Sequence, residues 1–165
     1  MREAIRERVE RDGVEAGTGA FVQAFGASEL DAANLLIPLV RFLPADDPRV
    51  QATADRIRRE LAADGLVYRY LRQDGLPGDE GAFVICSFWL VDNLAWRGDA
   101  EAARGLFEQI SGYANDVGLF AEQIDPVSGA QLGNFPQAFS HVGLIGAALN
   151  LEKAEAPVSV VARHG

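Results

Sequence analysis

The chain has 165 residues and a mass of 17.8 kDa, with 48% hydrophobic and 24% charged residues, which is the composition of one globular domain rather than of a disordered or fibrous chain. Its 24 acidic residues outnumber its 15 basic residues, and the resulting net charge of −9 disfavours binding to nucleic acid or to anionic membranes. The single cysteine, Cys86, excludes an internal disulfide, and the sequence shows neither a bilayer-spanning apolar run nor a secretory signal, so we expect a cytoplasmic location.

The first third of the chain predicts two helices separated by a loop. Residues 2–12 have helical propensity but few apolar positions, and the Gly-rich residues 13–27 predict a loop with a short extended stretch. Ser28 is a candidate N-cap for a helix over 28–43 that is apolar on nearly all sides. We expect this second helix to be deeply buried and to be kinked at Pro38.

An amphipathic helix is predicted over residues 47–63. Asp47 supplies a cap and Pro48 occupies the first helical position, where a missing backbone N–H costs nothing. Gly65 is expected to end the helix, and residues 66–70 are expected to be extended. One apolar stripe follows from the helical spacing of Val50, Ala54, Ile57 and Leu61.

The second half of the chain predicts three more helices and one long loop. Residues 81–97 and 137–151 are apolar almost all round, whereas residues 99–113 carry a single apolar stripe. The loop over 114–136 is longer than most loops, and its aromatic and aliphatic side chains indicate order and function. Residues 157–165 are expected to be a loose tail.

Deeply buried and amphipathic helices alternate along the predicted chain. Such alternation is typical of two concentric rings of helices, in which the inner ring contacts protein on every side. A helical repeat array is the alternative, but no period of matching positions supports it. The sequence therefore predicts an all-α fold.

Short enzyme motifs are absent from the sequence: it has no P-loop, HExxH, CxxC or GxSxG. The histidines, His141 and His164, lie far apart, so we expect no metal ion and no cofactor. Cys86 is expected to be a small buried hydrophobe. Glu122 and Glu80 are the candidate acids, because apolar neighbours desolvate a carboxylate and favour acid–base work.

Each candidate acid has a structural alternative. From composition alone, the favoured explanation of Glu122 is a loop carboxylate that accepts hydrogen bonds from nearby backbone amides, and that of Glu80 is a charge at a helix N-terminus. Aromatic residues near these acids suit the apolar faces of sugar rings, with core packing as the alternative for any one of them. These aromatic residues are Tyr68, Tyr70, Trp89, Phe120, Phe135 and Phe139.

Three stretches of the chain resemble glycoside hydrolase family 15, which contains glucoamylases, glucodextranases and bacterial trehalases. Residues 118–149, with the run AEQIDPVSGAQLGNFPQAFSH, resemble the family's C-terminal catalytic segment, and residues 66–94 resemble the block before it. Residues 29–50 are similar to bacterial members. The resemblance covers residues 3–152 and implies an (α/α)6 barrel of twelve helices that hydrolyses α-glucosidic bonds with inversion.

The resemblance also implies roles for five residues. Glu122 matches the family's general base, and Gln123 belongs to the same motif. Arg69 resembles an arginine that binds sugar hydroxyls, Phe139 stands where some members have a substrate-facing tryptophan, and Glu80 is expected to line the pocket. The expected substrate is an α-glucan end or trehalose.

About half of such a barrel is expected in this chain. Roughly six helices are predicted, and the family's Trp-Glu motif, which carries the general acid, is missing because Trp89 precedes Leu90 and Trp96 precedes Arg97. Residues 1–156 thus correspond to the C-terminal half of the catalytic domain. Whether the chain alone is an enzyme stays open.

Three explanations of the incomplete barrel remain. The chain is one part of a split enzyme whose partner supplies the acid, a non-catalytic module that binds carbohydrate or protein, or a truncated inactive gene product. In the first case the partner is the missing N-terminal half or a second copy of the chain. In every case we expect open apolar faces that promote association.

Overall fold

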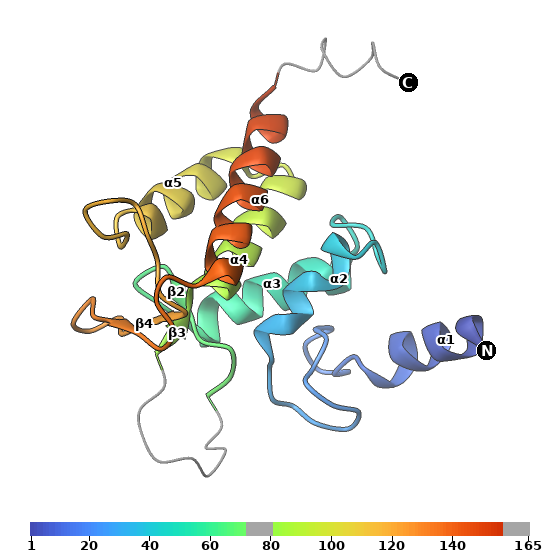
Figure 1. Ribbon diagram of the computed structural model, residues 1–165. Helices are drawn as coiled ribbons and strands as arrows, with labels where there is room; N and C mark the ends of the chain where they lie inside the picture. Colours follow the sequence, from blue (N-terminus) through green and yellow to red (C-terminus); the bar gives the residue numbers. More distant parts are fainter. Residues whose placement is uncertain (72–80, 157–165) are drawn as a thin grey trace.

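The structure analysed is a computed structural model, which describes residues 1–71 and 81–156 of the chain (Figure 1). In chain order its elements are α1 (Arg2–Asp12), the 3₁₀ helix η1 (Ala32–Leu35), α2 (Leu36–Leu39), α3 (Pro48–Glu60), β1 (Ala62–Ala63), β2 (Leu66–Val67), β3 (Ala82–Phe83), α4 (Val84–Trp96), α5 (Ala100–Ser111), β4 (Gln123–Ile124), β5 (Gln131–Leu132) and α6 (Ala138–Glu155). Every strand in the described residues has two residues, so the all-α prediction is confirmed.

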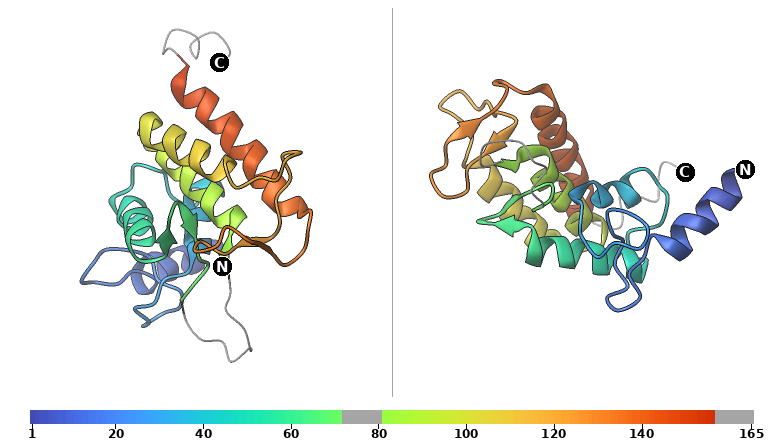
Figure 2. Two further views of the ribbon diagram at one scale, coloured as in Figure 1. Left: turned by 90° about the vertical axis from the view of Figure 1, so that its left-hand side faces the viewer. Right: turned by 90° about the horizontal axis from the view of Figure 1, so that it is seen from below.

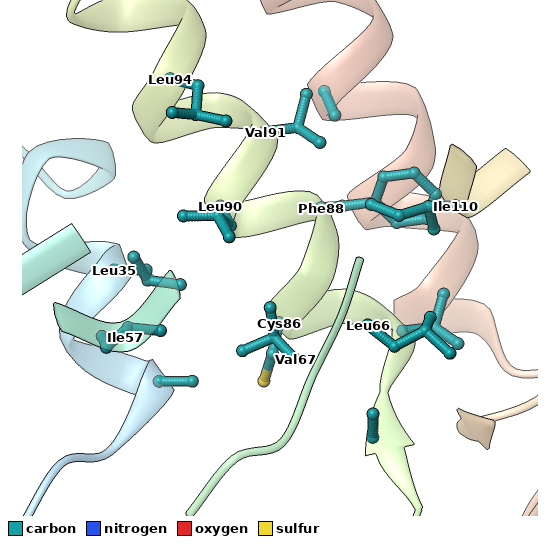
Figure 3. Close-up of a cluster of buried hydrophobic side chains, with 14 of the residues drawn as sticks. Leu35, Ile57, Leu66, Val67, Cys86, Phe88, Leu90, Val91, Leu94 and Ile110 are labelled. Carbon is teal, nitrogen blue, oxygen red and sulfur yellow. The ribbon is translucent and has the colours of Figure 1, made fainter. Parts of the chain in front are cut away.

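Helix α4 is the centre of the hydrophobic core. Its sequence VICSFWLVDNLAW is apolar on nearly every side, and side chains such as Val84, Phe88 and Val91 are fully buried, as predicted. The helix begins at Val84 rather than at residue 81, because Ala82 and Phe83 pair with β4 instead. Figure 3 shows α4 side chains meeting Leu35, Ile57, Leu66, Val67 and Ile110 from the surrounding elements.

Cys86 lies inside this core and confirms its interpretation as a small hydrophobe. The residue is 1% exposed. Burial raises the pKa of its thiol to about 12, because a thiolate would lose its hydration there. The side chain therefore stays a neutral thiol at physiological pH.

Helices α4 and α6 run side by side, and α5 packs against both (Figure 1). Gly143 makes the α4–α6 approach close: a Cβ atom at this position would lie 3.3 Å from the Ile85 Cγ1 and Phe88 Cβ atoms. The same pair of helices is joined by a hydrogen bond of 2.9 Å from Asn150 Nδ2 to Asp92 Oδ1. Asp92 itself is only 4% exposed.

The two predicted amphipathic helices are confirmed. Asp47 caps α3 by accepting a hydrogen bond from Arg49 N, and Asp99 caps α5 by accepting one from Ala102 N. The α3 stripe is buried at each predicted position, namely Val50, Ala54, Ile57 and Leu61. Helix α3 ends at Glu60, however, and Gly65, with φ of 80°, forms the turn between β1 and β2.

The predicted helix over residues 28–43 is wrong in extent. Asp31 accepts a hydrogen bond from Ala33 N, so the helical turns start at Ala32 as η1 and continue only to Leu39 in α2. Arg41 then adopts a φ of 58°, which no right-handed helix accommodates. The prediction of deep burial holds for Leu35 but fails for Val40, which is 68% exposed.

Helix α6 differs from the prediction in its burial. Its sequence is apolar almost all round, yet only the side towards α4 and α5 is covered. The opposite side carries four large apolar residues at helical spacing, each more than half exposed, which we call the α6 stripe: Phe139, Val142, Ile145 and Leu149. The alternation of buried and surface helices therefore holds for α3, α4 and α5 and fails for the first and last members of the series.

Helix α1 lies at the edge of the molecule, away from α4 and α6 (Figure 2). None of its residues is buried, in keeping with the few apolar positions of residues 2–12. The expected tail at 157–165 lies outside the described residues. None of the helices in residues 1–71 and 81–156 has the length and apolar character needed to cross a bilayer.

Candidate active site

A small sheet at the N-terminal end of α4 holds the main candidate residue, Glu122. Strand β4 pairs antiparallel with β3 on one side and with β5 on the other, so that Phe83 faces Gln123 and Gln123 faces Leu132. Strand β2 contacts β3, and Figure 1 shows β2, β3 and β4 gathered where α4 begins. The predicted loop over 114–136 is therefore ordered, as expected.

Glu122 directly precedes β4 and is half-buried. Its backbone carbonyl accepts a hydrogen bond of 3.2 Å from Val84 N, and its backbone N–H donates one of 2.9 Å to Asn134 O. The Asn134 side chain also contacts Glu122: its Nδ2 donates a hydrogen bond of 2.9 Å to Glu122 Oε2, and Asn134 N lies 3.4 Å from the same oxygen. Both backbone and side chain of Glu122 are thus anchored.

Gly133 permits this close contact. It has a φ of 74°, and a Cβ atom there would lie 3.0 Å from Glu122 Oε2. If the pairing of Gln123 with Leu132 continued regularly, Glu122 would lie opposite Gly133. Instead, Glu122 N donates its hydrogen bond to the carbonyl oxygen of the next residue, Asn134. The extra residue brings the Asn134 side chain to the carboxylate.

The start of α6 supports the two residues before Glu122. Ser140 Oγ donates a hydrogen bond of 2.7 Å to Ala121 O, and Gln137 N donates one of 2.9 Å to Phe120 O. His141 Nδ1 lies 2.7 Å from Gln137 O and its Nε2 lies 3.4 Å from Phe120 N, which fits a neutral ring that donates from Nδ1 and accepts at Nε2. The QAFSH part of the sequence is therefore a scaffold for Glu122.

Gln123, predicted to bind substrate, has a clear structural contact. Its Oε1 atom accepts a hydrogen bond of 2.9 Å from Gly81 N. This bond ties the residue after Glu122 to the segment that leads into α4. A role for Gln123 in substrate binding stays a prediction.

Arg69 lies two residues after β2, at the same end of α4 as Glu122. Its backbone carbonyl accepts a hydrogen bond of 2.8 Å from Ala32 N, and its guanidinium Nε lies 3.6 Å from Asp31 Oδ1. The guanidinium also lies 5.9 Å from the centre of the Tyr70 ring. The side chain is 50% exposed, so its remaining N–H donors are open to a ligand.

The candidate aromatic residues separate into core and surface. Phe120 is 1% exposed and packs edge-on against Phe88 with ring centres 5.9 Å apart, so it is a core residue. Phe135 and Phe139, on either side of the turn into α6, are 50% and 68% exposed. Only these two combine an exposed ring with a place close in sequence to the Glu122 scaffold. Glu80 lies outside the described residues.

The arrangement suits acid–base chemistry on a ligand with polar edges and apolar faces. It offers a carboxylate, a guanidinium and exposed phenyl rings at one end of the helical core. Among residues 1–71 and 81–156, no group of three or more His, Cys, Asp or Glu side chains is placed to hold a metal ion.

Two neighbours of the predicted residues were not recognised from the sequence. Asn134 contacts the Glu122 carboxylate, and Asp31 lies beside Arg69. Asp31 is far from Arg69 in sequence, so no local pattern signals the contact. The pair Gly133-Asn134 is a turn signal that could have indicated a bend back towards Glu122.

Comparison with known proteins places these residues in a family. Residues 1–149 match the family described as Glycosyl hydrolases family 15. The chain is 48% identical over 158 residues to a trehalase of Mycobacterium tuberculosis, a match that covers 92% of this chain and 23% of the relative. It is 41% identical over 155 residues to a trehalase of Thermoplasma volcanium, covering 93% of this chain and 25% of the relative. The chain thus spans about a quarter of the length of these relatives.

Solved structures agree with the sequence matches. A wild-type glycosidase superposes with a TM-score of 0.76 at 26% identity, over 91% of this chain and 43% of that structure. A glycosidase variant in complex with glucose superposes with a TM-score of 0.77 at 25% identity and the same coverage. The helices described above therefore form part of the (α/α)6 barrel that was expected. The chain belongs to glycoside hydrolase family 15.

Proposed function

We propose that this chain carries the general-base side of the active site of an inverting α-glucosidase. The observation that carries the proposal is the anchored carboxylate of Glu122, which is half-buried at the end of the helical core where Arg69 also lies. A base must be fixed against a water molecule, and both the backbone and the side chain of Glu122 are held.

In the proposed reaction Glu122 accepts a proton from a water molecule as the water oxygen attacks the anomeric carbon. The glycosidic C–O bond breaks at the same time, and a carboxylic acid on the opposite face protonates the departing oxygen. In inverting enzymes the two carboxyl groups stand about 6.5–9.5 Å apart, which leaves room for the water. Arg69 binds a sugar hydroxyl, and Phe139 offers an apolar ring to the sugar face. Glu80 and Gln123 are proposed to line the pocket.

Trehalose is the proposed substrate. The relatives at 41–48% identity over more than nine tenths of this chain carry the name trehalase, and this agreement supports trehalose over α-glucan ends. The glycosidase structure with bound glucose supports a glucosyl unit in the pocket. Trehalose is built of two such units.

The general acid is proposed to come from another polypeptide segment. The chain contains no Trp-Glu pair and spans about a quarter of the trehalase relatives. Residues 1–156 are proposed to be the C-terminal half of the catalytic domain, completed by its N-terminal half or by a second copy of the chain. The single cysteine supports a cytoplasmic location.

The test uses two substrates whose leaving groups differ in their need for a general acid, so that the role of the base can be measured by itself. Fluoride leaves α-glucosyl fluoride without protonation, so its hydrolysis requires the base alone, whereas trehalose also requires the acid. We expect the purified chain to convert α-glucosyl fluoride to β-glucose and Glu122→Gln to slow this reaction by roughly 10²–10⁴-fold. The control Glu108→Gln changes an exposed carboxylate on α5 and is expected to have no effect.

Trehalose is tested with the acid supplied. The chain replaces the matching 158-residue segment of the mycobacterial trehalase, and this chimera is expected to release glucose from trehalose. A chimera that remains fully active with Glu122→Gln, or a chain that yields α-glucose from the fluoride, overturns the proposal. Sugar binding without hydrolysis in both experiments favours the non-catalytic module, and neither binding nor hydrolysis favours an inactive gene product.

A further inference from the structure

The strongest unassigned feature of the site is the contact between Asn134 and Glu122. The two residues are 12 positions apart and form a reciprocal pair: Glu122 N donates to Asn134 O at 2.9 Å, and Asn134 Nδ2 donates to Glu122 Oε2 at 2.9 Å. A side-chain hydrogen bond to a carboxylate is charge-assisted, and such bonds are stronger than those between neutral groups.

The donors of Asn134 converge on one carboxylate oxygen. Both its Nδ2 and its backbone N approach Oε2, at 2.9 and 3.4 Å. Within the part of the chain that the structure describes, no group donates a hydrogen bond to Oε1 of Glu122. The two oxygens of the carboxylate are therefore inequivalent, and Oε1 keeps its lone pairs for another partner.

The backbone of the hairpin is shaped for this contact. Gly133 adopts a φ of 74°, and a Cβ atom at that position would lie 3.0 Å from Oε2. Asn134 is also exposed, so it has no part in the hydrophobic core. Within the described residues, its side chain has one hydrogen-bond partner, the Glu122 carboxylate.

We propose that Asn134 is a positioning residue of the proposed hydrolysis: it holds Oε2 of Glu122 so that Oε1 faces the attacking water and accepts its proton. This inference rests on the proposed function, because it assigns the two oxygens of the same base to different tasks. Without the Asn134 amide, the carboxylate rotates about its terminal torsion and no longer aims Oε1 at the water.

The contact itself is tested without any activity. In the purified chain, the side-chain amide protons of Asn134 are followed by ¹H–¹⁵N NMR as the pH falls from 7 to 3. We expect one proton to be shifted downfield at neutral pH in the wild type, and we expect this shift to vanish in Glu122→Gln. An Asn134 signal that is identical in wild type and Glu122→Gln at every pH overturns the inference.

The role in the reaction is tested with Asn134→Ala and Asn134→Asp on α-glucosyl fluoride. We expect kcat to fall roughly 10–100-fold in Asn134→Ala with KM changed less than about threefold, since the substrate site is untouched. In Asn134→Asp two carboxylates lie side by side, which favours protonation of one of them. On acidification, the rate of this variant is therefore expected to decline at a higher pH than the rate of the wild type. Ser128→Ala, which removes the hydrogen bond to Asp125 at the tip of the same hairpin, is the control.

The outcomes distinguish this inference from the proposed function. Hydrolysis that depends on Glu122 but not on Asn134 overturns the inference alone. A chain without Glu122-dependent hydrolysis overturns both the base role and the positioning role, even when the NMR contact is present. A fall in KM and kcat together with a lower thermal midpoint in Asn134→Ala indicates a structural role and also overturns the inference.

Discussion

At the scale of single residues, Asp92 is a carboxylic acid buried in the hydrophobic core, where its charged form is destabilised. It lies on α4 at 4% exposure, and burial raises the pKa of its carboxyl from 3.8 to about 6, although the hydrogen bond from Asn150 opposes this rise. The folded chain therefore holds this proton more tightly than the unfolded chain does. The stability that the neutral form contributes is complete below pH 3.8 and is lost as the pH rises through about 6.

Asp92→Asn is expected to stabilise the chain at pH 7.5 by roughly 1–3 kcal/mol, because the amide is neutral at every pH and still accepts from Asn150 Nδ2. The advantage over wild type should shrink steadily towards pH 4. Urea denaturation of both proteins across this pH range measures it, with Asp116→Asn, on the exposed surface, as the control. An advantage that does not depend on pH would show that the carboxylate is not the cause.

At the scale of the elements, the space around a glycine within a helix shows how closely a neighbouring helix packs at that position. Gly105 lies in the middle of α5, and apart from its chain neighbours and the backbone of its own helix no described atom lies within 4 Å of the place a Cβ would occupy. A Cβ on Gly143 of α6, in contrast, would lie 3.3 Å from α4. Gly105→Ala is expected to raise the free energy of unfolding by about 0.5–1 kcal/mol through helix propensity. Urea denaturation measures the change, and an unchanged or lower value contradicts it.

Gly143→Leu is expected to lower the free energy of unfolding by about 1–3 kcal/mol or more, because the larger side chain must displace Ile85 or Phe88. The same denaturation experiment measures the loss, and Gly105→Leu serves as its control for side-chain size. A stable Gly143→Leu chain would mean that α6 does not lie this close to α4.

The sequence was sufficient for elements whose signals are local. Residue type and spacing alone predict three features that the structure has: the caps Asp47 and Asp99, the α3 stripe and the burial of α4. The helix predicted over 28–43 failed because the Asp31 side chain competes for Ala33 N, and apolar content alone does not reveal that competition. Glu122 was predicted as a site residue from its motif, whereas its contact with Asn134 was not predicted, because that contact depends on a hairpin register that spacing does not fix.

At the scale of the whole molecule, the α6 stripe leaves apolar surface without cover. Its four members are 51–68% exposed along one side of the longest described helix. Contiguous apolar patches of more than about 300–600 Å² are rare on monomeric proteins. The chain is therefore expected to associate with a second copy, or with another polypeptide that covers α6, and to bind a dye for exposed apolar surface.

Ile145→Glu is expected to reduce both self-association in sedimentation velocity and dye fluorescence, because it places a charge in the middle of the stripe. Val127→Glu is the matched control, since Val127 is 94% exposed at a hairpin tip away from α6. A wild-type chain that sediments as a monomer, unfolds in one sharp transition and binds no dye would contradict this expectation.

The local scaffold of Glu122 has a consequence for folding. Its hydrogen bonds with Gln131, Asn134, Ser140 and His141 close loops of 10 to 21 residues. The side-chain hydrogen bonds that join α4 to Leu35 and to Asn150 close loops of 58. Loop-closure entropy rises by about 0.6 kcal/mol with each doubling of length. The segment around Glu122 therefore has the smaller entropic barrier to closure, and it is expected to gain native contacts before α4 meets its distant partners.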